Sequence, residues 1–145
     1  MSNARNLLNP LEQKWVVDRI RKAESETTGE IKVHLEDYAE GDQFNRAAEL
    51  FAALGMHKTK YLNGVLIYIA AKDHEFVVMG DMAMNQVVPE GFWEEMAQIL
   101  HNDFHMNDYF EGIAKVIRRV GAILKTHFPK KDTDTNEITD EISFG

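Results

Sequence analysis

The chain has 145 residues, 44% of them hydrophobic, which is enough to bury the core of one globular domain. It has no cysteine, which excludes disulfides, thiol catalysis and thiolate metal sites. No apolar run approaches the ~20 residues of a membrane helix, and the N-terminus lacks a signal-peptide core, so we expect a cytoplasmic protein without a membrane partner. The net charge is −8 and no dense basic patch is present, so nucleic acid is not an expected partner either.

The first predicted helix begins at Pro10, which suits the first helical position, with Asn9 before it as the N-cap. Apolar residues then recur at helical spacing, and one of them, Trp15, is expected to anchor the core. After a polar break, residues 30–36 alternate between apolar and polar types, which predicts a strand with one buried face. His34 falls on the polar face and is expected to be solvated.

The most hydrophobic stretch is residues 63–81, where two apolar runs flank a short polar turn. Their β-branched and aromatic content is typical of strands buried on both faces, and the turn predicts an antiparallel hairpin. A helix is predicted between the first strand and this hairpin, from about Asp42 to Leu54, with a buried stripe that includes Phe44. The order strand, helix, strand predicts a right-handed crossover, so the first two strands should be parallel.

Two more helices are predicted, one from Pro89 and one capped by Asp108. The predicted fold class is α/β, a three-layer α/β/α sandwich with a small mixed sheet flanked by helices. Residues 1–129 would form this single domain. From Lys131 onward one lysine faces five acids, half of the net charge of the chain, so residues 130–145 are predicted to be an acidic, disordered tail.

Acidic residues are expected to gather at one edge of the sheet, after the first strand, in the hairpin turn and at the start of the last helix: Glu36, Asp37, Asp73 and Asp108. Open α/β sheets place ligand crevices at the carboxyl ends of their strands, and carboxylate oxygens suit Ca²⁺ or Mg²⁺. The alternative is that each acid serves locally, as a turn former, a helix cap or a solvated loop residue. A second acidic pair, Glu30 and Asp81, is expected at the opposite edge and is the weaker candidate.

Several stretches resemble the TPM domain, a family that includes thylakoid-lumen proteins linked to photosystem II repair. They are TGEI at the first strand, FNRAAELFAALGM in the second helix, LNGVLIYIA followed by Asp73, and NDYFEGIAKVI entering the last helix. Together they cover about residues 27–128. The resemblance implies an α/β/α sandwich, divalent-cation binding and, for some members, acid-phosphatase activity. It falls on Asp73 and Asp108, which the expected geometry also brings to one edge.

Two departures from the family pattern bear on function. His74 stands where the family commonly has Arg after the turn Asp, and Met79-Gly80-Asp81 stands in place of a Gly-aromatic-Gly turn. Arg is the better bidentate partner of phosphate, so its absence disfavours phosphatase activity. We therefore expect a domain that binds Ca²⁺ or Mg²⁺ as a binding or regulatory module, with a protein partner that the sequence does not name. The alternative is a metal-assisted acid phosphatase acting on phosphomonoesters.

Overall fold

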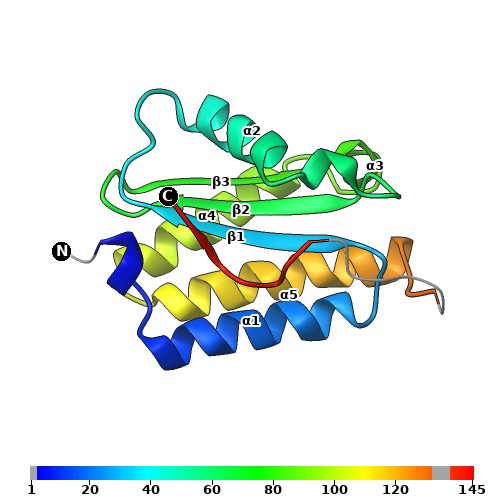
Figure 1. The fold of residues 1–145 in the computed structure, drawn as a ribbon, viewed down its shortest axis with the longest axis horizontal. Helices are drawn as coiled ribbons and strands as arrows, with labels where there is room; N and C mark the ends of the chain where they lie inside the picture. Colours follow the sequence, from blue (N-terminus) through cyan, green and yellow to red (C-terminus); the bar gives the residue numbers. More distant parts are fainter. Residues whose placement is uncertain (1–2, 132–137) are drawn as a thin grey trace.

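The computed structural model describes residues 3–131 and 138–145. Figure 1 shows a sheet that lies between two layers of helices. The elements, in chain order, are η1 (Ala4–Asn6), α1 (Pro10–Glu24), β1 (Glu30–Glu36), α2 (Gln43–Ala53), η2 (Met56–Lys58), β2 (Gly64–Ala70), β3 (Glu75–Gly80), α3 (Met82–Asn85), α4 (Phe92–His105), α5 (Tyr109–His127) and β4 (Ser143–Phe144). Within the described ranges, no helix has both the length and the apolar character that crossing a membrane requires.

Across the described residues the sheet has four strands, in the order β3-β2-β1-β4. Strands β1 and β2 are parallel, with Glu30 opposite Gly64 and Glu36 opposite Ala70. Strands β2 and β3 form the antiparallel hairpin that the two apolar runs predict. The predicted crossover and hairpin are both confirmed, so the carboxyl ends of β1 and β2 do lie at the same edge, beside the hairpin turn.

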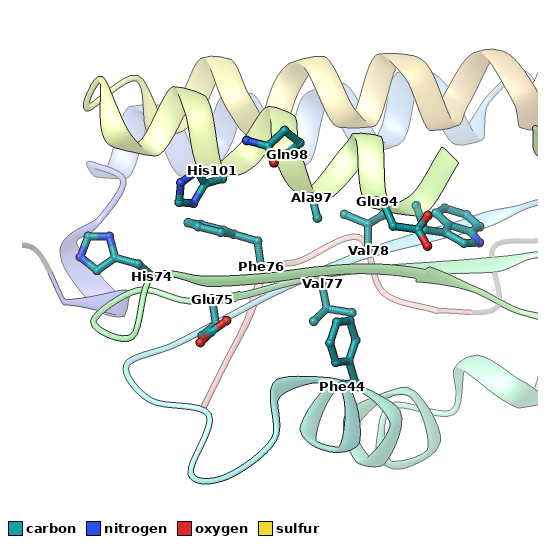
Figure 2. Close-up of a pocket in the computed structure, with 11 residues that line it drawn as sticks. Phe44, His74, Glu75, Phe76, Val77, Val78, Glu94, Ala97, Gln98 and His101 are labelled. Atoms are coloured by element: carbon teal, nitrogen blue, oxygen red, sulfur yellow. The ribbon is translucent and has the colours of Figure 1, made fainter. Parts of the chain in front are cut away.

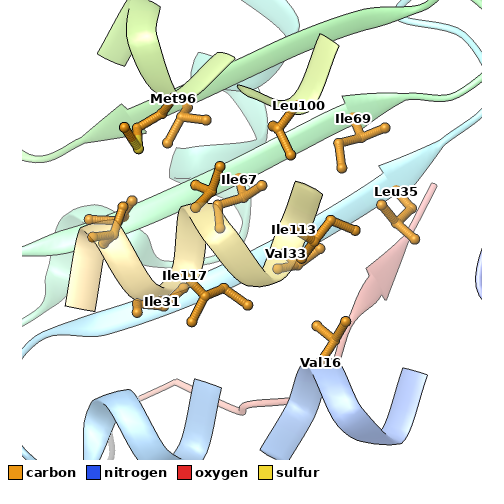
Figure 3. Packing of buried hydrophobic residues seen from close by; sticks show 14 of the residues in the cluster. Val16, Ile31, Val33, Leu35, Ile67, Ile69, Met96, Leu100, Ile113 and Ile117 are labelled. Atoms are coloured by element: carbon orange, nitrogen blue, oxygen red, sulfur yellow. The ribbon is translucent and has the colours of Figure 1, made fainter. Parts of the chain in front are cut away.

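Helices α1, α4 and α5 cover one face of the sheet, and α2 covers the other (Figure 1). This makes the predicted α/β/α sandwich. The larger core lies between the sheet and the three-helix layer, where side chains from alternate strand positions meet the helices (Figure 3). Its central members are fully buried aliphatic residues: Ile31, Val33, Leu35, Ile67, Ile69, Leu100, Ile113 and Ile117.

A smaller core lies between the sheet and α2, and its helix residues are Ala47 and Leu50. Phe44 was expected in that stripe, but it is 59% exposed because it sits in the first turn, at the margin of the sheet. Trp15 was expected in the larger core, and this is also wrong: it is 42% exposed and packs edge-to-face on Phe110, with ring centroids 5.5 Å apart. Both aromatic residues have helical spacing, but helical spacing does not say how far a helix overhangs the sheet.

The end of the chain differs most from expectation. Residues 138–145 run along the free edge of β1, and β4 pairs with it in parallel, Ser143 opposite His34. Disorder was expected for residues 130–145, and for the segment 138–145 the structure corrects this. The rest of the expectation falls largely on residues 132–137, which lie outside the described residues.

This segment also explains why β1 is buried on both faces although its sequence alternates. Lys32 Nζ donates to the carbonyl of Glu141 at 2.6 Å, and Ser143 Oγ lies 2.8 Å from His34 Nδ1. His34 is only 3% exposed, so the expectation that it is solvated is wrong. Backbone pairing, side-chain contacts with the polar face of β1 and the packing of Ile142 and Phe144 against the larger core hold the segment. Two apolar residues in a short acidic stretch do not make a pattern that predicts this docking.

Ile67→Ala tests the doubly covered sheet. Ile67 is fully buried in the larger core, so its truncation should lower the free energy of unfolding by about 3 kcal/mol in urea denaturation. Leu11→Ala is the matched control, because Leu11 is 53% exposed and its loss should cost less than about 0.5 kcal/mol. Equal costs for the two variants would contradict a sandwich with a covered sheet.

Ending the chain after residue 137 tests the docked segment. The deletion removes the contacts of Lys32 and His34 described above and the bond from Gly145 N to Leu35 O, 3.0 Å long. At ~1 kcal/mol for each, the free energy of unfolding should fall by about 3 kcal/mol. Glu141→Gln, at a side chain that is 66% exposed, should change it by less than about 0.5 kcal/mol. An unchanged melting temperature for the shortened chain would show that the segment contributes nothing in solution.

Candidate functional site

The carboxyl edge of β1 is organised around Glu36, a carboxylate that is 4% exposed. Arg46, one turn into α2, donates to both of its oxygens, from Nε at 2.9 Å and from Nη2 at 2.8 Å. Tyr68, opposite His34 on β2, donates its hydroxyl to the same carboxylate, and His34 Nε2 lies 3.3 Å from Glu36 Oε1. His34, Glu36 and Tyr68 share one face of the sheet because they occupy alternate or opposite positions of neighbouring strands, and Arg46 reaches that face from α2.

The hydrogen bonds determine the ionisation of the cluster. Burial disfavours the charged form of Glu36, but the bonds from Arg46, Tyr68 and His34 outweigh it and lower the pKa of Glu36 to about 2. Burial, followed by the bond to Glu36, raises the pKa of Tyr68. Burial lowers the pKa of His34, so this imidazole is neutral at pH 7. At neutral pH the cluster is therefore a carboxylate–guanidinium pair with a neutral phenol and a neutral imidazole.

Arg46 and Tyr68 were not among the candidates that the sequence suggested. Arg46 was one residue of a helix, and Tyr68 was one residue of an apolar strand. The sequence predicted parallel strands but no register, so it gave no signal for Tyr68, which the structure places opposite His34. A signal for Arg46 was available, because this residue lies one turn into the helix that returns over that face. A buried acid at the strand end requires a cation within reach, and Arg46 is the first basic residue after it.

Asp37 and Asp73 hold neighbouring segments together at the same edge. Asp37 Oδ1 accepts a hydrogen bond from Ala4 N at 2.7 Å, and Asp73 Oδ2 accepts one from Ala39 N at 2.8 Å. The carbonyl of Asp37 accepts from Lys72 N at 2.9 Å, which extends the β1–β2 ladder into the loops. Among the described residues, no Lys or Arg lies within ion-pair distance of either carboxylate. Each aspartate therefore uses one oxygen to bind backbone and keeps its negative charge unpaired.

Asp108, the fourth predicted member, is exposed at the start of α5. It was expected to cap that helix, but its side chain makes no capping hydrogen bond. Its charge acts on Lys115, whose pKa is raised first by the hydrogen bond to Asp103 and to a smaller degree by Asp108. No hydrogen bond or ion pair connects Asp108 with the three acids at the strand ends, so the structure brings together Glu36, Asp37 and Asp73.

A hollow of about 400 Å³ opens beside this edge. Four of the residues that line it are acidic and one is basic: Glu36, Asp37, Glu40 and Glu49 with Arg46. Arg46 Nη1 also lies 3.6 Å from Glu49, which is largely exposed. The hollow thus carries an excess of negative charge, which favours a cation over an anion.

The fit of a divalent cation to these residues can be tested on the geometry. Across residues 3–131 and 138–145, no group of three or more His, Asp or Glu side chains is placed to hold a metal ion. Glu36 fits poorly, because Arg46 and Tyr68 already occupy its oxygens. Asp37 and Asp73 each accept one backbone hydrogen bond, through Oδ1 and Oδ2 respectively, and carboxylate oxygens of this kind suit Mg²⁺, which commonly uses one or two carboxylates with several waters, and Ca²⁺, which accepts backbone carbonyls as well.

The opposite edge holds the weaker candidate pair. Asp81 caps α3 with Oδ1, which accepts from Met82 N at 2.8 Å, while its backbone N donates to the carbonyl of Gly64. Glu30, opposite Gly64 on β1, is 2% exposed. Asn63 lies next to Gly64, is fully buried and donates to Thr28 Oγ1 at 3.0 Å. These bonds make Asp81 a helix cap and Asn63 a link between strand starts, while Asp81 Oδ2 and Asn63 Oδ1 are buried without a hydrogen-bond partner among the described residues.

The geometry thus defines an α/β/α sandwich domain with an acidic carboxyl edge. The chain belongs to the TPM domain family, whose pattern it matches over residues 1–123. This confirms the resemblance seen in the sequence.

Solved structures agree. The chain is similar to the BA42 protein from the psychrophilic bacterium Bizionia argentinensis sp. nov., with 41% identity, a TM-score of 0.86 and 95% of each chain covered. The N-terminal domain of a P. gingivalis protein shares the fold at 19% identity and a TM-score of 0.67, over 84% of this chain and 79% of that one. The N-terminal domain of the cg2496 protein from Corynebacterium glutamicum shares it at 11% identity and a TM-score of 0.54, over 88% and 77%. A search of curated proteins gave no significant match.

Glu36→Gln tests the ionised cluster. The pKa of Glu36 is about 2 in the folded state against an ordinary value of 4.5, so its charge stabilises the fold above pH 4.5 and this contribution is lost as pH falls towards 2. Urea denaturation at pH 6 and pH 3 should show a variant that is about 2 kcal/mol less stable at pH 6 and loses less between the two values than wild type. Glu49→Gln, on the exposed partner of the same Arg46, should keep the wild-type pH dependence. Identical pH dependence in all three proteins would contradict the assigned pKa.

Proposed function

We propose that this domain binds a divalent cation, Ca²⁺ or Mg²⁺, at the carboxyl edge of the sheet and acts as a cation-responsive binding module. Asp37 and Asp73 would be the carboxylate ligands, together with loop carbonyls and water. The observation that carries the proposal is that these two unpaired carboxylates belong to adjacent loops that are tied together by their own hydrogen bonds.

The position of the two aspartates suits a regulatory module. Asp37 joins the loop after β1 to the N-terminal η1, and Asp73 joins the same loop to the hairpin turn. A cation bound here would neutralise charge at the meeting point of three segments. It would therefore stabilise their mutual arrangement and any protein contact that depends on it.

Acid-phosphatase activity is the alternative function that the family resemblance implies, and the charges of this sheet edge disfavour it. Arg46, whose guanidinium lines the hollow, is held by Glu36 through both carboxylate oxygens. His74 stands at the position where an arginine would suit phosphate. It is exposed, and its backbone is left-handed, with φ of 56°. A hollow with four acids repels a phosphate dianion.

Thermal unfolding with and without metal tests the proposal. Ca²⁺ or Mg²⁺ at ten times its dissociation constant should stabilise the folded state by about 1.4 kcal/mol and raise the melting temperature by about 4 °C. Asp73→Asn and Asp37→Asn keep an oxygen that can accept the backbone hydrogen bond, so both should fold and lose this rise. Asp18→Asn, on the exposed surface of α1, should retain it.

Three outcomes would contradict the proposal. A rise abolished by Asp81→Asn but kept by Asp73→Asn would move the ion to the opposite edge of the sheet. Metal-dependent turnover of p-nitrophenyl phosphate that disappears with Asp73→Asn would favour the hydrolase. No rise with up to 10 mM of either ion, about ten times the weakest dissociation constant expected for a physiological site, would exclude the cation.

A further inference from the structure

The two edges of the sheet differ in whether another strand covers them. The edge of β1 is covered by the C-terminal strand β4 of the same chain. The edge of β3 has no neighbouring strand in the described part of the chain. Strand β3 reads EFVVMG and contains neither Lys nor Pro, the residues with which proteins commonly block an open edge.

The register of the hairpin shows which backbone groups of β3 face outward. Asp81 N donates to the carbonyl of Gly64 at 2.9 Å, beside the pair formed by Val65 and Gly80. In an antiparallel ladder every second residue bonds to the neighbouring strand, so the backbone groups of Glu75, Val77 and Met79 bond to β2. Phe76 and Val78 therefore present their N–H and C=O groups away from β2. Among residues 3–131 and 138–145, these four outward groups have no hydrogen-bond partner.

A groove of about 380 Å³ follows this open edge. Figure 2 shows that α4 borders it on one side with Ala97, Gln98 and His101, while Phe44 of α2 points towards Val77 from the other side. The side chains of a strand added to β3 would point alternately to these two sides. Phe44, which is 59% exposed and outside the core, thereby gains a role as an apolar contact for every second residue of that strand.

The charge of the groove limits what can bind there. Its lining contains the acids Glu75 and Glu94 and neither Lys nor Arg, and the whole chain carries a formal net charge of −8. A second copy of this chain would bring the same two acids and the same net charge to the contact, so self-pairing through β3 is disfavoured. A segment with Lys or Arg beside its apolar residues would complement the groove.

We propose that the open edge of β3 and its groove bind an extended peptide segment of a partner protein, with alternating apolar side chains and flanking Lys or Arg. The segment would add to the sheet as a fifth strand, through the outward groups of Phe76 and Val78, a mode of recognition in which backbone bonds give affinity and side-chain pockets give specificity. This surface is independent of the cation proposed above, so either one can fail without the other.

The test uses the full chain and the acetylated, amidated peptide KVTVKVT. Titration up to 2 mM, followed by amide NMR shifts, should perturb Phe76 and Val78 most and slow their hydrogen exchange. The same peptide N-methylated at its three central residues loses its donors on both edges and should bind at least tenfold more weakly. The peptide EVTVEVT should also bind more weakly, by about fivefold, because its charges match those of Glu75 and Glu94.

Variants of the chain complete the test. Phe44→Ala should weaken binding about tenfold, and Glu94→Gln about two- to threefold, while Leu11→Ala, at another exposed apolar residue, should leave it unchanged. Three results would overturn the proposal: no shift up to 2 mM peptide, equal affinity of the N-methylated peptide, or shifts centred away from β3. Dimerisation that sedimentation detects and that Phe44→Ala abolishes would also overturn it, in favour of a second copy of this chain.

Discussion

Strand β1 carries an ionisable side chain at every second position on a face that is buried, and much of the structure follows from the need to satisfy these groups. The four side chains, each 2–4% exposed, are Glu30, Lys32, His34 and Glu36. A buried charge without a partner costs several kcal/mol, so the chain must supply partners from elsewhere. Helix α2 supplies Arg46 to Glu36, and the C-terminal segment supplies the carbonyl of Glu141 to Lys32.

This constraint separates two roles among the acids of the carboxyl edge. Glu36 is committed to the fold, because its charge is balanced by Arg46 and its oxygens are occupied. Asp37 and Asp73 accept hydrogen bonds from neutral backbone N–H groups and form no ion pair with any described residue, so their charges are available to an external cation. Position at a sheet edge is therefore a weaker guide to a binding site than the charge balance of each residue.

The hydrophobic pattern predicted the strands, the hairpin and the crossover, because apolar period and turn chemistry are local properties of the sequence. It could not predict that residues 138–145 dock on β1, since the docking depends on backbone groups and on side chains far away in the chain, and the two apolar residues that pack on the core, Ile142 and Phe144, are too few to form a strand pattern. His34 was expected to be solvated because its partner, Ser143 of that segment, is far away in the chain. The sheet edge that collects Glu36, Asp37 and Asp73 was predicted from topology, while the partnership of Glu36 with Arg46 and Tyr68 required the three-dimensional register.

The short strand β4 has a consequence for how this sheet can grow. With only Ser143 and Phe144 in the ladder, β4 closes the β1 edge and offers almost no template for a further strand. Growth by strand addition is therefore possible in one direction only, outward from β3. A sheet of this kind can accept one added strand, at β3, and has no second open edge at which a further chain could pair. This favours complexes of fixed stoichiometry over fibres.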